Sequence, residues 1–277
     1  MVPLRVYVLV EDYSGYESPF LAQHGVSFLI EADGKRILFD AGQSAEPILH
    51  NMRLLGIEPA SIDYVFLSHC HYDHTGGLLG ILRAIGRRVP VVAHPSIFRR
   101  HFITKPYLRE VGLPFGRKEV EELADLYLTA DPLPITENVL STGEITARED
   151  FERAELEVYT IENGKVVRNE LRDDMSLIAK TPEGLVVISG CSHAGIVSIV
   201  KHAVRLTGEE RVKAVIGGFH LIEAGDERIR KTAEEFQRLG VEEVYTGHCT
   251  GLRAEAEFLK AYGERFHKLH AGMVIEL

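Results

Sequence analysis

The sequence concentrates side chains that can bind metal in one short stretch, residues 68–77, with the order Ser-His-Cys-His-Tyr-Asp-His-Thr-Gly-Gly. Three imidazoles and one carboxylate fall within six positions there. Imidazole and carboxylate are common protein ligands of zinc and related divalent metals. His69 and His71 can converge on one metal, whereas Asp73 and His74 can serve a second. The stretch predicts a metal centre, because ordinary loop histidines would leave four neighbouring ligand-type side chains unexplained.

Strand ends supply further histidines. An apolar run at 62–67 precedes the ligand stretch and a glycine pair follows it, as expected for a buried strand, a loop and then a helix. Three other predicted strands also end next to a histidine, and these are His193, His220 and His248. Strands that run the same way deliver their carboxyl ends to one edge of a sheet. Six strand-end histidines therefore indicate metal binding.

The elements that position these residues come in a mixed order. Hairpin signals, an Asp-Gly at 33–34 and an Asn-Gly at 163–164, join pairs of apolar runs. Helices are expected at about 45–56, 76–86, 195–207, 226–239 and 252–264. Hairpins come first and strand–helix–strand units come last. This order favours an α/β layered sandwich over a doubly wound parallel sheet.

Between about residues 96 and 138 the strand–helix alternation lapses. We interpret this segment as an insertion, with a helix at 118–128, that forms a lid or cap over one end of the sheet. It is rich in basic residues, including Arg99 and Arg100, although the chain carries a formal net charge of −10. One interpretation is a solvated charged face. The other is a lid whose cations bind an anionic substrate such as a phosphate.

The composition is that of a soluble globular protein, with 277 residues, of which 45% are hydrophobic and 26% charged. We expect one domain, residues 1–277. The net charge of −10 argues against nucleic acid as the main partner. No run approaches the roughly 18 apolar residues that a membrane span needs, and no signal peptide is predicted. We therefore expect a cytoplasmic protein without a membrane partner, and a homo-oligomer stays open.

The three cysteines imply no disulfide framework, yet each lies beside a histidine of the predicted centre. Cys70 separates two of these histidines, Cys191 lies two positions before His193, and Cys249 follows His248. One interpretation is that small, soft residues tolerate the tight turns near a metal. The alternative is that a cysteine, Cys191 above all, is itself a ligand.

The order His-x-His-x-Asp-His at 69–74 matches the signature of the metallo-β-lactamase superfamily, which this chain therefore resembles. Asp40, at the end of an early predicted strand, matches the acidic residue that supports the ligand histidines in that superfamily. A wider set of motifs is similar to the superfamily's dihydropteroate-synthase-like branch. Those motifs lie at 22–25, 190–195, 217–221 and 246–251.

The resemblance implies a four-layer αββα sandwich of the metallo-β-lactamase type and a site with two divalent metal ions. We expect zinc, with iron and manganese as alternatives. The first metal would take His69, His71 and His193, and the second Asp73, His74 and His248. Behind these ligands we expect Asp40 and Cys191. The predicted catalytic residues are Asp73 and His220, and the predicted substrate-binding residues are His24, Arg99 and Arg100.

One position departs from the superfamily pattern. The bridging aspartate usually follows a strand that ends in Ser-Gly, but here Cys191 follows Ser189 and Gly190. No acid stands at this position. We therefore expect a weaker second metal site, a bridging hydroxide, or Cys191 or His220 in place of the acid.

The activity that the resemblance implies is the condensation of a dihydropterin pyrophosphate with an aminobenzene ribofuranosyl phosphate, so the partner would be an anionic small molecule. A metallo-hydrolase of the phosphoesterase or lactone type, using a metal-activated water, is the first alternative. A non-catalytic protein that binds metal or ligand on the same fold is an alternative of another class.

Overall fold

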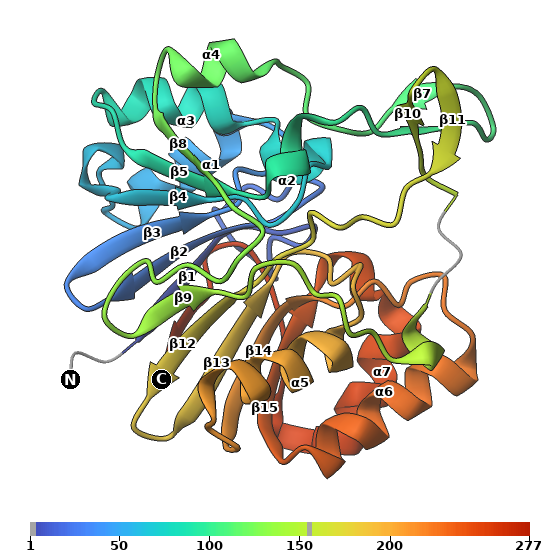
Figure 1. Cartoon of the computed structure of the whole chain (residues 1–277). Helices are drawn as coiled ribbons and strands as arrows, with labels where there is room; N and C mark the ends of the chain where they lie inside the picture. The colour runs from blue at the N-terminus through green and yellow to red at the C-terminus, as the bar shows by residue number, and fades with distance from the viewer. Residues whose placement is uncertain (1–3, 154–156) are drawn as a thin grey trace.

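The computed structural model describes residues 4–153 and 157–277. Residues 1–3 of the predicted domain, and Leu156 at the start of the apolar run before the Asn-Gly turn at 163–164, lie outside the described residues. Within the described ranges the strands form three sheets of seven, six and four strands. The two larger sheets stack face to face, and the smallest projects to one side (Figure 1).

The seven-stranded sheet has the order β17-β1-β2-β3-β4-β5-β8. Its strands are β1 (Arg5–Val10), β2 (Ser27–Ala32), β3 (Lys35–Phe39), β4 (Tyr64–Phe66), β5 (Pro90–Ala93), β8 (Asp125–Leu128) and β17 (Val274–Glu276). The six-stranded sheet has the order β16-β15-β14-β13-β12-β9. Its strands are β9 (Val139–Ser141), β12 (Leu177–Thr181), β13 (Gly184–Ser189), β14 (Val212–Gly218), β15 (Val241–Gly247) and β16 (Phe266–Lys268).

Helices cover the outer face of each large sheet (Figure 1). On the seven-stranded side are α1 (Ala45–Leu54), α3 (Leu78–Ile85) and α4 (Arg117–Glu121). On the six-stranded side are α5 (Ile196–Thr207), α6 (Asp226–Arg238) and α7 (Leu252–Tyr262). The predicted αββα sandwich is confirmed. None of the helices in the described ranges is long and apolar enough to cross a membrane.

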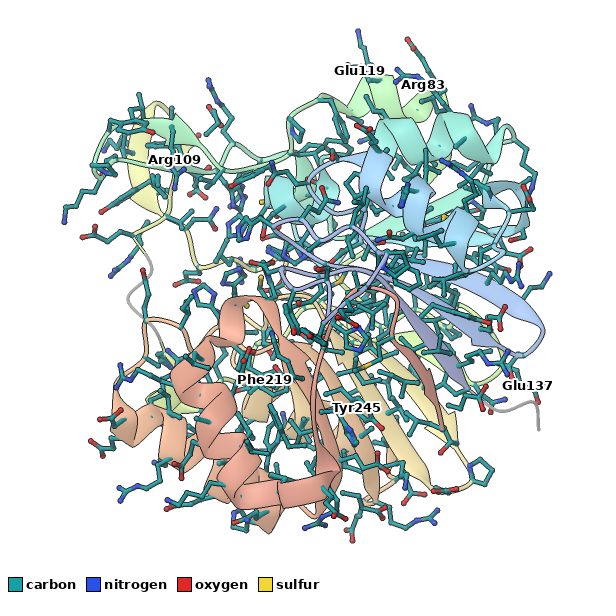
Figure 2. The ribbon with its side chains drawn as sticks, turned by 180° about the vertical axis from the view of Figure 1, so that it is seen from behind. Arg83, Arg109, Glu119, Glu137, Phe219 and Tyr245 are labelled. Atoms are coloured by element: carbon teal, nitrogen blue, oxygen red, sulfur yellow. The ribbon has the colours of Figure 1, made fainter. Side chains whose placement is uncertain are left out.

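Three apolar cores hold the four layers together. Between the sheets, Phe28 and Ile30 of β2 share a buried cluster with Val186 and Ile188 of β13. Every residue of β13 is buried, as expected for a strand covered on both faces. Outside the six-stranded sheet, Phe219 packs against two phenylalanines of α6 and α7, with ring centroids 5.5 Å apart in each pair (Figure 2).

Parallel pairing explains why the histidines meet. β13, β14 and β15 run parallel to one another, so the loops that follow Ser189, Gly218 and Gly247 leave the sheet at the same edge. In the other sheet β3 and β4 are also parallel, which brings Asp40 next to the loop after β4. The short helix α2 (Tyr72–Thr75) then turns the ligand stretch back toward this edge.

The segment 96–138 differs from the prediction. The helix predicted at 118–128 is wrong, because α4 ends at Glu121 and β8 follows it as a strand parallel to β5. In β8 the half-buried Leu126 and Leu128 alternate with exposed residues and pack on the core of the seven-stranded sheet. Pairing with β5 thus overrides the local helical pattern.

The projecting sheet also divides the predicted insertion. Its strands β6 (Phe102–Ile103) and β7 (Arg109–Glu110) come from that segment, whereas β10 (Tyr159–Glu162) and β11 (Lys165–Arg168) come from later in the chain. Arg109 stands on this projection, well to the side of the two stacked sheets (Figure 2). The segment is therefore shared between a main sheet and a projecting hairpin pair, and its action as a lid stays a prediction.

Candidate metal centre

The three histidines predicted for the first metal lie together at the common edge of the two sheets. The ring centroids of His69 and His71 are 4.7 Å apart, and that of His193 is 4.8 Å from His69 and 4.9 Å from His71. His69 comes directly from the end of β4, and His193 from the loop after β13. Strands of different sheets thus supply one compact group.

The nitrogen atoms of this group are suited to a cation. His71 Nε2 and both ring nitrogens of His193 are buried and have no hydrogen-bond partner among the described residues. Burial lowers the pKa of His69 and of His193 well below the ordinary value, and lowers the pKa of His71 to about 4. Neutral imidazoles with buried, unused lone pairs are what a divalent metal binds. The group therefore fits a metal ion.

The residues predicted for the second metal converge on one carboxylate oxygen. Asp73 Oδ2 lies 3.3 Å from His74 Nε2 and 3.3 Å from His248 Nε2. Burial would raise the pKa of Asp73, but His74 and His248 outweigh it and hold that pKa well below the ordinary value. The Asp73 side chain is therefore a buried carboxylate that faces two imidazoles.

Carboxylates behind the two imidazoles set their orientation. Asp40 Oδ2 lies 2.7 Å from His74 Nδ1, and Asp12 Oδ1 lies 2.7 Å from His248 Nδ1. In each ring the Nδ1 hydrogen is donated to this carboxylate, which leaves Nε2 directed at Asp73. Metal-binding histidines commonly have such a partner, and it raises their basicity as ligands.

Asp12 was missed by the sequence analysis, as was its neighbour Glu11. Glu11 accepts a hydrogen bond from the backbone nitrogen of His248 and another from Lys268 Nζ at 3.2 Å. Both acidic residues follow the apolar run of β1, just as Asp40 follows β3. Acidic side chains at the ends of strands were thus a signal available in the sequence.

Cys191 lies between the two groups. Its Sγ is 3.0 Å from His74 Nε2. The Sγ atom lies within 4.8 Å of the ligand atoms of Asp73, His74 and His248, and equally within 4.8 Å of those of His69 and His193. Burial raises the pKa of this thiol well above its ordinary value, so the proton stays on sulfur until a metal displaces it. The Cys191 thiol thus lies among the candidate ligand atoms of both groups.

His220 and His24 flank the ligand groups. The His220 ring centroid is 4.4 Å from that of His193, and its Nδ1 is buried without a hydrogen-bond partner in the described part of the chain. His24 Nε2 lies 3.5 Å from Asp73 Oδ2, and its side chain is half exposed. His24 therefore stands where a substrate could reach the second group.

The two predicted substrate-binding arginines lie farther out. Arg99 Nη1 is 3.0 Å from Glu162 Oε1, and Arg100 forms an ion pair with Glu110. Both arginines are exposed, and both glutamates belong to the projecting sheet. The structure does not bring these arginines to the metal-ligand groups, so their contact with substrate stays a prediction.

The fold and the buried side-chain groups define an α/β protein with a histidine-rich candidate metal centre. Residues 22–173 match the family model of the metallo-beta-lactamase superfamily. The chain belongs to this superfamily, as its ligand motif predicted.

Similar proteins cover nearly the whole chain. Over 99% of this chain and 96% of the relative, the sequence is 46% identical to the 7,8-dihydropterin-6-methyl-4-(beta-D-ribofuranosyl)-aminobenzene-5'-phosphate synthase of Methanocaldococcus jannaschii. The structure matches Tm1679, a metal-dependent hydrolase of the β-lactamase superfamily, with a TM-score of 0.85 and 31% identity over 99% of both chains. A diphosphatase of the PhnP family shares the fold at 14% identity and a TM-score of 0.56, covering 99% of this chain and 98% of its own.

Proposed function

We propose that this chain is a metal-dependent enzyme that condenses a dihydropterin pyrophosphate with an aminobenzene ribofuranosyl phosphate. The observation that carries the proposal is the 46% identity, over 99% of the chain, to a synthase whose name describes such a product. The similarity to a synthase in sequence and to a hydrolase in structure supports an enzyme in either case. The buried ligand groups would provide its reactive centre.

We propose that two divalent ions bind at this centre, the first to His69, His71 and His193 and the second to Asp73, His74 and His248. Zinc suits this mixture of imidazole, carboxylate and thiol, and iron and manganese are the alternatives. Bound metal would supply Lewis-acid stabilisation of the leaving pyrophosphate, or would activate a water in a hydrolase. Cys191, which belongs to both groups of ligand atoms, would replace the bridging acid.

In the condensation, the amine nitrogen attacks the carbon that carries the pyrophosphate, and the carbon–oxygen bond breaks. Pyrophosphate leaves with the electron pair, and the amine loses a proton. We assign that proton to His220 Nδ1, which is buried and has no hydrogen-bond partner among the described residues. Asp73 would stay ionised and position the second metal, while half-exposed His24 would contact the substrate.

A hydrolase is the second candidate, because the structure matches a metal-dependent hydrolase at 31% identity. In that reaction water would take the place of the amine as the acceptor. The phosphoesterase and lactone types both remain within this alternative. The same metal ligands would serve it.

The test measures pyrophosphate release from the dihydropterin substrate with and without the aminobenzene acceptor, and detects the coupled product by mass spectrometry. Release that requires the acceptor and yields the product supports condensation. Release without the acceptor supports a hydrolase. Turnover of phosphodiesters or lactones alone supports the other hydrolase types, and no turnover of any of these substrates supports the non-catalytic binding protein. The variant His71→Ala should lose metal and all activity. The variant His220→Ala should keep most of its metal but turn over more slowly.

We propose an anionic small molecule as the partner, without nucleic acid or a membrane surface. The net charge of −10 supports this choice, because phosphate backbones bind basic surfaces. The three cysteines are free thiols, which suits a reducing cytoplasm. Binding of RNA or DNA that weakens steeply with salt would contradict the proposal.

A further inference from the structure

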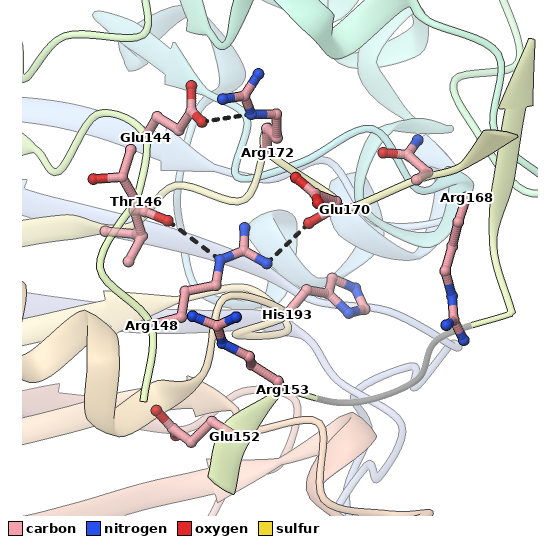
Figure 3. A pocket seen from close by; sticks show the side chains of 11 residues that line it. Glu144, Thr146, Arg148, Glu152, Arg153, Arg168, Glu170, Arg172 and His193 are labelled. Atoms are coloured by element: carbon pink, nitrogen blue, oxygen red, sulfur yellow. Dashed lines mark hydrogen bonds and ion pairs between the residues drawn. The ribbon is translucent and has the colours of Figure 1, made fainter. Parts of the chain in front are cut away.

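A cavity of about 320 Å³ opens beside the metal centre, with His193 in its wall (Figure 3). Its other lining residues come from two segments, 144–153 and 168–172. A second cavity of about 270 Å³ shares four residues of the latter segment and extends to Arg99. The two cavities form a groove, which we call the arginine groove, that leads from His193 toward the projecting sheet.

Among the described residues that line the first cavity, four are arginines. They are Arg148, Arg153, Arg168 and Arg172. This density of cations contrasts with the net charge of −10 of the whole chain. Three glutamates, Glu144, Glu152 and Glu170, also line the cavity, and Arg153 forms an ion pair with Asp150 at 3.4 Å. Glu144 forms an ion pair with Arg172 at 2.8 Å. Glu152 accepts hydrogen bonds from the first turn of α5 and is buried there.

Arg148 carries the strongest indication of an anion. Three backbone carbonyls hold its guanidinium. Nε lies 3.2 Å from the oxygen of Ile145, and Nη1 lies 2.9 Å from that of Glu170 (Figure 3). Nη2 lies 3.3 Å from the oxygen of Leu171. Carbonyl oxygens orient a guanidinium without neutralising its charge. Because an arginine has five N–H groups, these three bonds leave donors for a ligand.

A phosphate group matches this arrangement. A fixed, planar guanidinium binds phosphate oxygens through two parallel hydrogen bonds, and it keeps its charge at any physiological pH. A volume of about 320 Å³ also lies at the lower end of the range for small-molecule pockets, roughly 300–1,000 Å³. The cavity can therefore take a phosphate together with the part of the molecule that carries it.

We propose that the arginine groove binds a phosphate monoester of the substrate, with Arg148 as its main contact and with Arg168 and Arg172 along the wall. The proposal rests on the proposed function, in which the substrates are phosphorylated. Held there, the phosphate would direct the rest of the substrate past His193 to the ligand groups. Arg99, which the sequence indicated, lines only the second of the two cavities, and the proposed phosphate contacts are other arginines.

The probe is phenylphosphonate, an aryl phosphate analogue whose carbon–phosphorus bond resists hydrolysis, titrated by calorimetry into the metal-loaded protein. We expect Arg148→Gln to raise its Kd about tenfold or more, since a charge-assisted bidentate contact is lost. Arg168→Gln should raise it several-fold. The matched control Arg83→Gln removes the same charge from α3, away from the groove, and should leave the Kd unchanged (Figure 2).

Metal content and the unfolding midpoint are measured for each variant, because Arg148 also joins two loop segments. If Arg148→Gln unfolds, Arg168→Gln still tests the groove. An unchanged Kd in every folded groove variant overturns the proposal. The condensation assay separates this failure from that of the proposed function. If the variants form product with unchanged KM values, the proposed function holds and the groove proposal fails. If phosphonate binding depends on the arginines but no product forms, the groove proposal holds and the proposed function fails.

Discussion

Replacing Asp40 with asparagine tests whether a carboxylate behind the ligands determines metal affinity. Asp40 is fully buried, and its carboxylate accepts three hydrogen bonds. Oδ1 accepts from the backbone nitrogen of Ser68 at 2.7 Å, and Oδ2 accepts from Ser68 Oγ and from His74 Nδ1, each at 2.7 Å. Its φ of +57° lies in the left-handed region. Asparagine tolerates that region and has nearly the same size, so the change removes charge and one acceptor without straining the backbone.

The magnitude follows from these contacts. Asparagine has one acceptor oxygen, so satisfying the nitrogen of Ser68 turns its NH₂ toward His74 Nδ1. This contact between NH₂ and Nδ1 either loses the hydrogen bond or moves the histidine hydrogen from Nδ1 to Nε2, the atom that faces Asp73. A hydrogen bond to a charged group contributes about 1.5–3 kcal/mol. Loss of such an outer partner typically lowers metal affinity about 10–100-fold. We expect that loss at the second site and a much smaller change at the first.

The assay is competition for zinc against a chromophoric chelator, which resolves two affinities per chain. The matched control is Asp63→Asn, because Asp63 is also an acceptor for a backbone nitrogen, that of Arg36 at 3.0 Å, but lies at the other end of β4. It should leave both metal affinities unchanged. If Asp40→Asn binds both metals within twofold of the unchanged protein, the reasoning about tautomer and charge is refuted.

Three further predictions concern backbone, charge and sulfur. Gly25→Ala should lower the free energy of unfolding by about 2–3 kcal/mol or more, because the new Cβ would lie 1.8 Å from the Asp73 carbonyl oxygen. In the control Gly34→Ala the Cβ meets no atom within 4 Å, so the free energy of unfolding should fall by only about 1 kcal/mol. Denaturant melts measure both changes. Burial raises the pKa of Asp174 from 3.8 to about 7, so the metal-free folded state binds a proton that the unfolded chain has lost. The free energy of unfolding of the metal-free protein should therefore fall, by at most a few kcal/mol, as the pH rises from about 4 to about 7. The same melts should show a smaller fall in Asp174→Asn. Cobalt-loaded protein should show a thiolate-to-metal absorption band that Cys191→Ser removes, and a band that survives in this variant would exclude Cys191 as its source.

The sequence was enough to predict the layers and the edge at which the candidate ligands lie, for a local physical reason. Hairpin residues such as Asp33 and Gly34 take the left-handed conformations that a tight turn needs. Apolar runs such as β13 bury both faces and can hardly lie anywhere but inside a sandwich. A loop begins at the carboxyl end of the strand before it, so the strand fixes the position of a histidine at the start of the loop. His193 and His248 could therefore be assigned to one edge before any contact was known.

Other features depended on partners that lie far away in the chain. The strand β8 exists because β5 is there to pair with it, so its local pattern was misleading. Asp12 became part of the centre only when β1 and β15 brought it to His248.

The same distinction holds for the charges around the site. The basic residues at 99–118 stood out in the sequence, yet Arg99 and Arg100 meet glutamates of the projecting sheet. Arg148 drew no notice, but the carbonyl of nearby Ile145 and those of Glu170 and Leu171, from a later segment, hold it in the wall of the cavity beside His193. Residue types and strand ends, which are local, were enough to predict a metal centre and to place its candidate ligands at one edge. Which arginines line the cavity beside that candidate centre depends on the partners of each side chain, and only the tertiary structure decided it.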